Sequence, residues 1–182
     1  GVPEKPVRVA SYNILHNRRG RDAVIKQIQS TKPDFVLLQE LDGDNLREMS
    51  KQLGMEYQFY YPSENLDGEH ATWGNAILAK HPLYDARSIP NPGGGSFGVW
   101  AWTVIDNKKF MIACVHLSAT WNANPKHIAE SSNNRYKEIS NLKKAWEARN
   151  KPPIIVGGDF NQLPIGNNYT EMTTDLTDTL KQ

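Results

Sequence analysis

Cysteine is almost absent from this chain, which has only Cys114 among its 182 residues. A single cysteine excludes an intrachain disulfide framework and a cysteine-rich zinc site. Cys114 lies in the apolar segment MIACVH, and a free cysteine in such a segment usually behaves as a small buried hydrophobe. We therefore expect Cys114 to occupy a buried strand position rather than to act as a reactive thiol.

Long apolar runs and a strong net charge are also missing. No run approaches the roughly 20 apolar residues that span a bilayer, so we expect no membrane span. The formal net charge is +1, so any anion-binding site has to be local rather than a property of the whole surface. With 38% hydrophobic and 23% charged residues, the composition is typical of a soluble globular protein. The length suits one domain with its own core.

The sequence shows no internal repeat, no low-complexity tract and no signal peptide. The chain begins at Gly1 rather than at methionine, and an exported protein whose signal peptide has been removed is one interpretation. The compartment and the oligomeric state both stay open at this stage.

Apolar periodicity predicts alternating strands and helices along the chain. The expected strands are 7–12, 35–39, 57–61, 75–79, 83–89, 97–105, 109–116 and 154–158. The expected helices are 21–30, 46–53, 135–149 and, as a short helix, 170–180. Asp22 is expected to cap the first helix and Gly54 to end the second, with a tight turn at 106–108. The polar stretches 62–73 and 118–134 are expected to be long loops, which in compact domains are often functional.

Four of the expected strands end in polar residues that are capable of chemistry. These endings are Asn13 after RVASY, Glu40 after FVLLQ, His116 after FMIACV, and the pair Asp159 and Asn161 in IIVGGDFN. One such ending would carry little information. Four endings of the same polarity suggest that the strands share one edge of a sheet, where ligand sites of open α/β folds gather.

The first two endings can be placed by topology. Strand 7–12, helix 21–30 and strand 35–39 form a crossover unit with short links, so its two strands run parallel. Asn13 and Glu40 should then be neighbours. An amide oxygen beside a carboxylate favours a hard cation such as Mg²⁺ or Mn²⁺, and Asp159 adds a second carboxylate.

Each of these residues also has a purely structural explanation. Asn13 could cap the loop that follows it, and Glu40 could stand at an exposed helix entrance. His116 could be a structural histidine, and Asp159 could hold a turn through backbone hydrogen bonds. The joint arrangement favours function, because four independent coincidences of this kind are improbable.

Other candidates surround these strand ends. His16 and Arg18, followed by Arg19 and Arg21, lie close after Asn13 in HNRRGR, where a basic cluster could bind phosphate. A solvated surface loop is the alternative for that cluster.

Three tryptophans lie in segments where their role can be predicted. Trp121, in the second long loop, could stack on a base or sugar or pin the loop down. Trp100 and Trp102 share one face of a strand, and we expect both to pack in the core.

The motifs SYNILH, LQEL, WGNAILAKHPL, VHLS and GGDFNQLP resemble, in their order and spacing, the endonuclease/exonuclease/phosphatase superfamily. The resemblance covers about residues 7–164. It implies a layered α/β sandwich in which two mixed β-sheets pack face to face with helices outside, formed by residues 1–182 as a single domain. It also implies divalent-metal-dependent cleavage of a phosphate ester.

Residue roles follow from the resemblance. It implies that Glu40 binds Mg²⁺ (or Mn²⁺) with Asn13 beside it, and that Asp159 orients and deprotonates the attacking water. Asn161 would position Asp159 or the phosphate, and His116 would contact the phosphate and assist the leaving oxygen. Asn75 would lie near the substrate, with a turn role as its alternative. His16 and Arg18 are candidate substrate contacts on separate grounds, because they lie close after Asn13. Such parts suit in-line attack on phosphorus.

The sequence departs from the family pattern after Pro164. Members of the family close with a later strand that ends in Ser-Asp-His, and no such segment follows. We therefore expect a C-terminally incomplete domain whose last strands are missing. The leading hypothesis is a phosphodiesterase or nuclease. The alternatives are a phosphatase or phospholipase C-like enzyme acting on inositol phosphates or lipid headgroups, and an inactive binding module.

Overall fold

The computed structural model describes residues 6–15, 20–63, 73–163 and 166–179. The chain divides into two compact units. Residues 1–116 and 152–159 form the first, which we call the strand unit, and residues 117–151 and 160–182 form the second, which we call the helix unit. The expectation that the whole chain is one domain stays a prediction.

The first sheet of the strand unit has the strand order β1-β2-β4-β3. β1 (Val9–Asn13) pairs in parallel with β2 (Phe35–Asp42), and α1 (Arg21–Ser30) connects them. β4 (Trp73–Ala79) is antiparallel to both β2 and β3 (Tyr57–Pro62). The predicted crossover unit is thus confirmed, and it brings the carboxyl ends of β1 and β2 together.

The second sheet has the order β5-β6-β7-β8. β5 (Tyr84–Pro90), β6 (Ser96–Ile105) and β7 (Lys108–His116) run antiparallel in sequence. β8 (Ile154–Asp159) then pairs in parallel with β7. Each sheet therefore mixes parallel and antiparallel pairs, as predicted.

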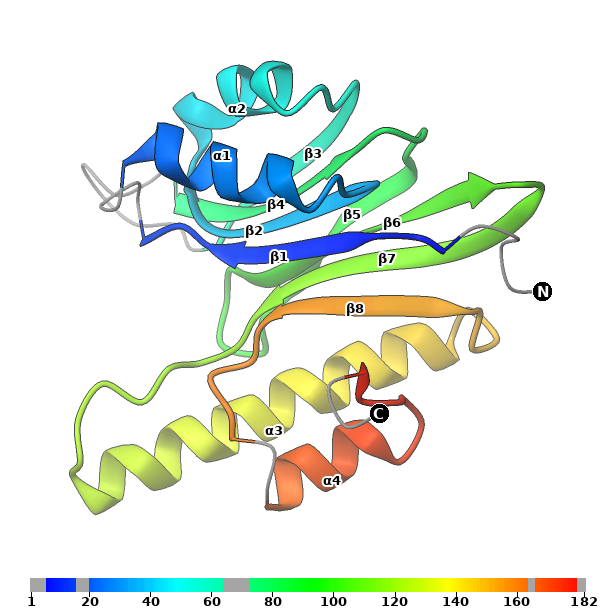
Figure 1. The fold of residues 1–182 in the computed structure, drawn as a ribbon. Helices are drawn as coiled ribbons and strands as arrows, with labels where there is room; N and C mark the ends of the chain where they lie inside the picture. The colour runs from blue at the N-terminus through cyan, green and yellow to red at the C-terminus, as the bar shows by residue number, and fades with distance from the viewer. Residues whose placement is uncertain (1–5, 16–19, 64–72, 164–165, 180–182) are drawn as a thin grey trace. The chain divides into compact units, whose positions relative to one another are not determined.

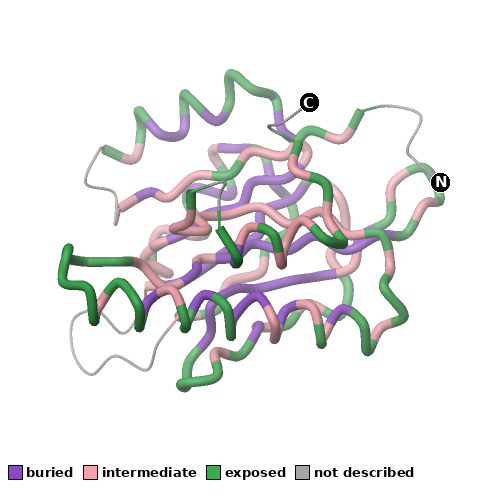
Figure 2. Tube along the Cα trace, turned by 90° about the horizontal axis from the view of Figure 1, so that it is seen from below, coloured by how far each residue is buried: buried purple, intermediate pink, exposed green. Residues whose placement is uncertain are grey.

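The two sheets pack face to face around an apolar layer. Phe35, Leu37 and Ile77 of the first sheet lie in one buried cluster with residues of the second sheet, among them Val99 and Ile112. α1 and α2 (Leu46–Gln52) cover the opposite face of the first sheet (Figure 1). Buried residues accordingly follow the strands in Figure 2. The expected α/β sandwich is confirmed.

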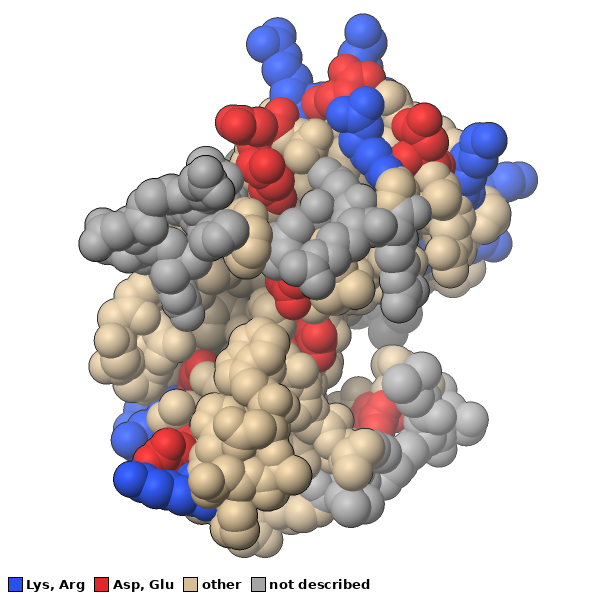
Figure 3. All heavy atoms as spheres, turned by 90° about the vertical axis from the view of Figure 1, so that its left-hand side faces the viewer, with Lys and Arg blue, Asp and Glu red and all other residues tan. Residues whose placement is uncertain are grey.

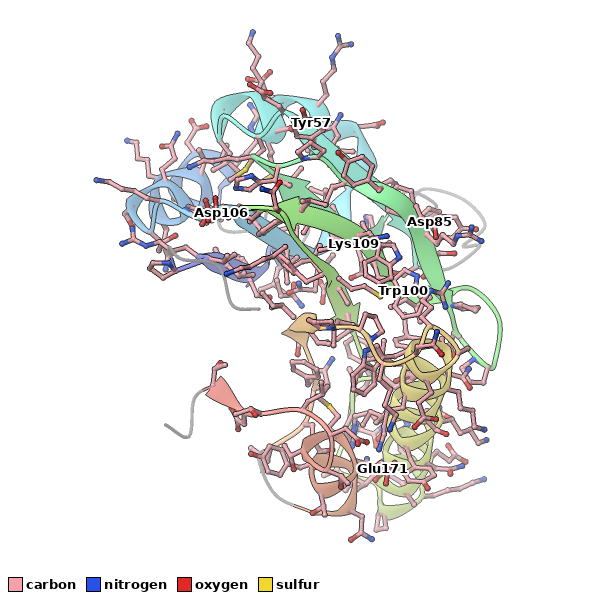
Figure 4. The ribbon with its side chains drawn as sticks, turned by 90° about the vertical axis from the view of Figure 1, so that its right-hand side faces the viewer. Tyr57, Asp85, Trp100, Asp106, Lys109 and Glu171 are labelled. Carbon is pink, nitrogen blue, oxygen red and sulfur yellow. The ribbon has the colours of Figure 1, made fainter. Side chains whose placement is uncertain are left out.

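The strand unit confirms some local expectations and corrects others. Asp106 and Asn107 have φ of 49° and 59° and form a two-residue turn, with Asp106 at the far end of the β6–β7 hairpin (Figure 4). Gly54, at φ 65°, ends α2 as expected. Asp22 is not the cap of α1, because Gly20 holds that position and Asp22 lies in the first turn, where a carboxylate complements the helix dipole.

The cysteine and tryptophan expectations can be checked in the same unit. Cys114 is fully buried and free, as predicted. Trp100 is buried, also as predicted. Trp102 is only partly buried, and the ammonium of Lys109 lies 4.3 Å from the centroid of its ring.

The helix unit corrects the expected loop 118–134. α3 (Pro125–Glu147) begins ten residues before the predicted start at Arg135. The Asn124 side chain accepts a hydrogen bond from the Lys126 amide and Pro125 occupies the first helical turn, which are strong start signals. The serines and asparagines at positions 131–134 are weak helix formers. Apolar periodicity therefore does not predict the first part of this helix.

α4 (Asn167–Thr173) packs with α3 inside the helix unit. It is shorter than the expected helix 170–180 and begins three residues earlier. The Lys143 ammonium lies 2.8 Å from Glu171 and 2.9 Å from Asp175. Its hydrogen bond with Glu171 raises the pKa of Lys143, and Lys143 lowers the pKa of Asp175. Among the described helices of both units, none is long and apolar enough to cross a bilayer.

Gly158 provides a test of how closely β8 approaches β7. Its φ is 147°, and a Cβ at this position would overlap the carbonyl oxygen of Val115. We expect Gly158→Ala to lower the free energy of unfolding by more than about 3 kcal/mol, or to prevent folding. Gly93→Ala is the control, since its nearest neighbour would be the Asn91 side chain at 3.9 Å. Urea unfolding compares them, and equal stability of the two variants would contradict this account.

Candidate functional site

Three proposed site residues end strands of the strand unit. Asn13 is the last residue of β1, His116 of β7 and Asp159 of β8. His116 and Asp159 are direct register partners across the parallel pair β7–β8. Asn13 is the register partner of Gln39, the residue before Glu40. The expectation of one shared sheet edge is wrong, because β1 and β2 belong to one sheet and β7 and β8 to the other. The expectation that Asn13 and Glu40 are neighbours is confirmed.

The side chain of Asn13 joins the two carboxylates. Its Nδ2 donates to Glu40 Oε1 at 2.9 Å and to Asp159 Oδ2 at 3.0 Å. Its Oδ1 accepts from the Leu15 amide at 3.0 Å, which fixes the orientation of the amide group. Because Glu40 belongs to one sheet and Asp159 to the other, this amide links the two sheets at the site.

His116 completes the group of side chains. Its Nε2 lies 3.8 Å from Glu40 Oε1, the same oxygen that accepts from Asn13. About a fifth of each of these two side chains is exposed, 20% for His116 and 19% for Glu40. The imidazole and the carboxylates are thus partly shielded from water but remain accessible to a ligand.

A β-bulge turns Glu40 toward this group. The β2–β4 register runs from Leu38 opposite Ala76 to Leu41 opposite Gly74, so two β2 residues, Gln39 and Glu40, face the single β4 residue Asn75. Glu40 has a left-handed backbone, with φ of 54°. A bulge of this kind re-aims a side chain. In a regular strand, Glu40 would point to the opposite face of the sheet from Gln39. The bulge allows both side chains to point to the face between the two sheets.

The glycines before Asp159 let the second sheet approach the first. A Cβ at Gly157 would lie 2.6 Å from Leu37 Cδ1, closer than real contacts allow. Any larger residue would therefore require either the Leu37 side chain or β8 to shift. The sequence predicted glycines that permit close approach, and Gly157 is one of them.

Asn75 lies inside β4 and is fully buried, so its alternative role in a turn is wrong. Its Nδ2 donates to Ser63 Oγ at 3.2 Å. Its Oδ1 has no hydrogen-bond partner within the described part of the chain. A buried acceptor without a partner costs about 1–3 kcal/mol, and a donor from a bound molecule or a water would remove that cost.

Asn161 belongs to the helix unit, two residues after Asp159 in the chain. It has φ of 45°, a conformation that asparagine tolerates better than most residues. Its Nδ2 donates to the Leu117 carbonyl at 2.8 Å. Leu117 directly follows His116, so this bond ties together the segments that leave β7 and β8.

The basic cluster is described only in part. His16, Arg18 and Arg19 lie outside the described residues, so their predicted substrate contacts stay predictions. Arg21 is the first residue of α1, and its Nη1 lies 3.4 Å from Asn45 Oδ1. Arg21 is thus engaged with the segment that precedes α2.

Trp121 does not pin its loop down, because 80% of it is exposed. Its backbone amide donates to His127 Nε2 at 3.0 Å. The loop is instead held by buried polar groups, since the Arg135 guanidinium donates to the Ser118 carbonyl at 2.8 Å and Glu138 accepts from the Ser118 amide at 2.9 Å. The ring is therefore presented to solvent on a fixed loop.

The donor set fits a hard cation by its chemistry. It contains carboxylates of Glu40 and Asp159, the amide of Asn13 and one imidazole, and carboxylate and amide oxygens are the ligands that Mg²⁺ and Mn²⁺ prefer. An amide oxygen has two lone pairs, so Asn13 Oδ1 can accept from Leu15 and still face a cation. Across the described ranges, no three His, Cys, Asp or Glu residues gather into a ready-made metal cluster.

Gln39 was missed at the sequence level. It is 1% exposed, and its Nε2 bonds to groups on three strands. The available signal was the presence of an amide at the end of the apolar run FVLLQ. Apolar periodicity indicates only the end of a strand at this residue, because the bulge that follows it does not change the apolar pattern.

The fold and the site define a class of protein, an α/β sandwich with acids, an amide and an imidazole at the carboxyl ends of strands from both sheets. The chain matches the Endonuclease/Exonuclease/phosphatase family over residues 10–179. It belongs to that family.

Individual proteins are similar to this chain in sequence or in fold. An uncharacterized protein of Caenorhabditis elegans is 27% identical over 93% of this chain, and the chain spans 58% of that relative's length. The human Nocturnin catalytic domain with bound sulfate anion has a TM-score of 0.68 and 21% identity, with 95% of this chain and 72% of that chain covered. A Staphylococcus aureus beta toxin mutant with bound magnesium ions has a TM-score of 0.69 and 14% identity, covering 94% and 70%.

The left-handed backbone of Glu40 predicts an unusual order of stability. Most residues pay about 1–2 kcal/mol for this conformation, and glycine does not. Glu40→Gly should therefore be more stable than Glu40→Ala by about 1 kcal/mol in urea unfolding. Gln58, exposed on β3 with an ordinary backbone, is the control and should show the reverse order. A Glu40→Gly variant less stable than Glu40→Ala would show that the bulge is not as described.

Proposed function

We propose that this protein hydrolyses phosphate diesters, with a nucleic-acid backbone as the leading substrate, by in-line attack of an activated water assisted by a divalent metal. The observation that carries the proposal is the Asn13 amide hydrogen-bonded to both Glu40 and Asp159, with His116 beside the same Glu40 oxygen. Family membership supports the reaction class.

Glu40, with Asn13 beside it, would hold the cation, which we propose to be Mg²⁺ or Mn²⁺. The oxygen-rich donor set supports this proposal, and so does the magnesium bound to the structurally similar beta toxin. When bound, such an ion offsets the charge that develops on the phosphate oxygens.

The other residues divide the remaining work. Asp159 accepts a proton from the attacking water, and His116 donates to a phosphate oxygen or to the leaving oxygen. Asn161 holds the segment that follows Asp159 through its bond to Leu117. Asn75 is proposed as a substrate contact through its unpaired oxygen. His16 and Arg18, outside the described residues, are proposed as further substrate contacts.

The face drawn in Figure 3 shows no broad basic track for a polyanion. Figure 3 shows Lys and Arg side chains standing beside Asp and Glu over the part of the strand unit that carries α1 and α2. Affinity for a nucleic acid would therefore come from local phosphate contacts and from stacking on Trp121, rather than from a strong overall field. A phosphatase or phospholipase C-like activity is the alternative that the substrate tests below distinguish.

The first test measures metal-dependent cleavage. We expect the protein with Mg²⁺ to cleave plasmid DNA or a diester dye faster than inositol phosphates or sphingomyelin, and EDTA to abolish the reaction. Glu40→Gln and Asp159→Asn should each lower kcat/KM at least about 100-fold, because each removes a group that acts on the reacting atoms.

Asp85→Asn is the matched control for these acids. Asp85 lies on β5 (Figure 4) and pairs with Arg87 at 2.7 Å on the surface, so this variant should keep full activity. Faster cleavage of inositol phosphates or sphingomyelin than of DNA or the diester dye would favour the phosphatase or phospholipase C-like alternative over the proposed nuclease. Folded protein that cleaves nothing, or a Glu40→Gln variant as active as the parent, would refute the metal-dependent hydrolase itself.

The second test concerns Trp121. Stacking of a base on an aromatic ring contributes about 1–3 kcal/mol, so Trp121→Ala should raise KM for a single-stranded oligonucleotide by about 5- to 160-fold. It should leave the KM of a small diester dye unchanged. Tyr84→Ala, which removes an exposed aromatic residue of β5, should change neither value. Equal KM values for the oligonucleotide before and after Trp121→Ala would exclude the stacking role.

A further inference from the structure

A second group of polar side chains lies one step back along the strands from the proposed site, with Gln39 and Cys114 buried and Ser11 exposed. Ser11 is two residues before Asn13 on β1, and Cys114 is two residues before His116 on β7. Gln39 directly precedes Glu40 on β2. Each strand that supplies one of these three site residues therefore also supplies one member of this inner group, which we call the inner polar triad.

Gln39 connects the triad. Its Nε2 lies 3.2 Å from Cys114 Sγ, 3.3 Å from Ser11 Oγ and 3.1 Å from the Leu37 carbonyl. Cys114 belongs to the second sheet, whereas Ser11 and Gln39 belong to the first. One amide group thus links three strands and both sheets directly behind the carboxylate of Glu40.

The backbone before Glu40 is held from both sides. The Gln39 carbonyl accepts from the Ile14 amide at 3.1 Å, which fastens it to the end of β1. The Cys114 thiol donates to the Leu38 carbonyl at 3.4 Å. A left-handed residue in a strand persists only where its surroundings fix it, and these bonds supply such surroundings at the bulge.

Packing alone does not account for a glutamine at this position. The layer between the sheets is otherwise apolar, and Leu37 of the same strand lies in it. Burying an amide there is costly unless it is hydrogen-bonded. Burial also raises the pKa of the Cys114 thiol to about 12, so the thiol stays protonated and serves as a hydrogen-bonding group rather than a nucleophile.

We propose that Gln39 is a positioning residue that, through Cys114 and Ser11, fixes the bulge and thereby sets the Glu40 carboxylate against Asn13 and His116. The part of this proposal that concerns catalysis rests on the proposed function. Gln39 itself touches neither substrate nor metal and acts through the backbone of its neighbour.

Gln39→Met is the main test, since methionine keeps a similar shape and cannot donate hydrogen bonds. Changes to groups that orient metal ligands typically cost 10- to 100-fold in metal affinity or activity. We expect Gln39→Met to weaken Mn²⁺ binding, measured by calorimetry, by about 10-fold or more. kcat should fall by a similar factor, with little change in KM.

Thr103→Val is the matched control for the loss of a buried polar group. Thr103 is fully buried on β6 and donates to the Pro82 carbonyl at 3.0 Å. This variant should lose stability and keep both Mn²⁺ affinity and kcat. If Gln39→Met does not fold, two changes at Cys114 replace it. Cys114→Ser retains an acceptor and should stay within about threefold of the parent, whereas Cys114→Val should reproduce the loss.

A metal-free measurement separates this proposal from the proposed function. The side-chain amide signals of Asn13 in a ¹H–¹⁵N spectrum report its bonds to Glu40 and Asp159. They should move in Gln39→Met and stay in place in Thr103→Val. Unmoved Asn13 signals in Gln39→Met would overturn the positioning role even in an active enzyme. The Asn13 signals could also move in Gln39→Met although the parent protein neither binds Mn²⁺ nor cleaves diesters. That result would support the positioning role and refute only the proposed function.

Discussion

The hydrogen bonds from one amide group to two carboxylates are the interaction on which the site depends. Asn13 donates to Glu40 at the end of one sheet and to Asp159 at the end of the other. Two carboxylates that accept hydrogen bonds from the same nitrogen lie close enough to repel each other unless a donor or a cation lies between them. The amide therefore allows two acids from separate sheets to share one small space.

The fold serves this arrangement by bringing the strand ends together. Parallel pairing places Asn13 beside the segment that contains Glu40, and it places His116 opposite Asp159. The bulge in β2 then turns Glu40 inward, and Gly157 permits the close approach of β8. Both features are locally unfavourable, because Glu40 has a left-handed backbone and Gly157 has no side chain to pack. Such costs are typical of functional sites.

Much of this was predictable from the sequence, and the remainder has identifiable physical reasons. Apolar periodicity located every strand to within a few residues, and the crossover rule placed Asn13 next to Glu40. Periodicity could not reveal the bulge, because it depends on the pairing of β2 with β4 rather than on the local pattern. It could not reveal the role of Gln39 either, because that role depends on Cys114 of the other sheet. The start of α3 was missed since its capping signal at Asn124 precedes a run of serine and asparagine.

The most direct test of the central claim is the anomalous scattering of Mn²⁺ in crystals of the protein. We expect a Mn²⁺ ion to contact the Glu40 carboxylate and its density to be lost in Glu40→Gln. Crystals soaked to saturation that show Mn²⁺ only at other positions, or density unchanged in Glu40→Gln, would contradict this claim.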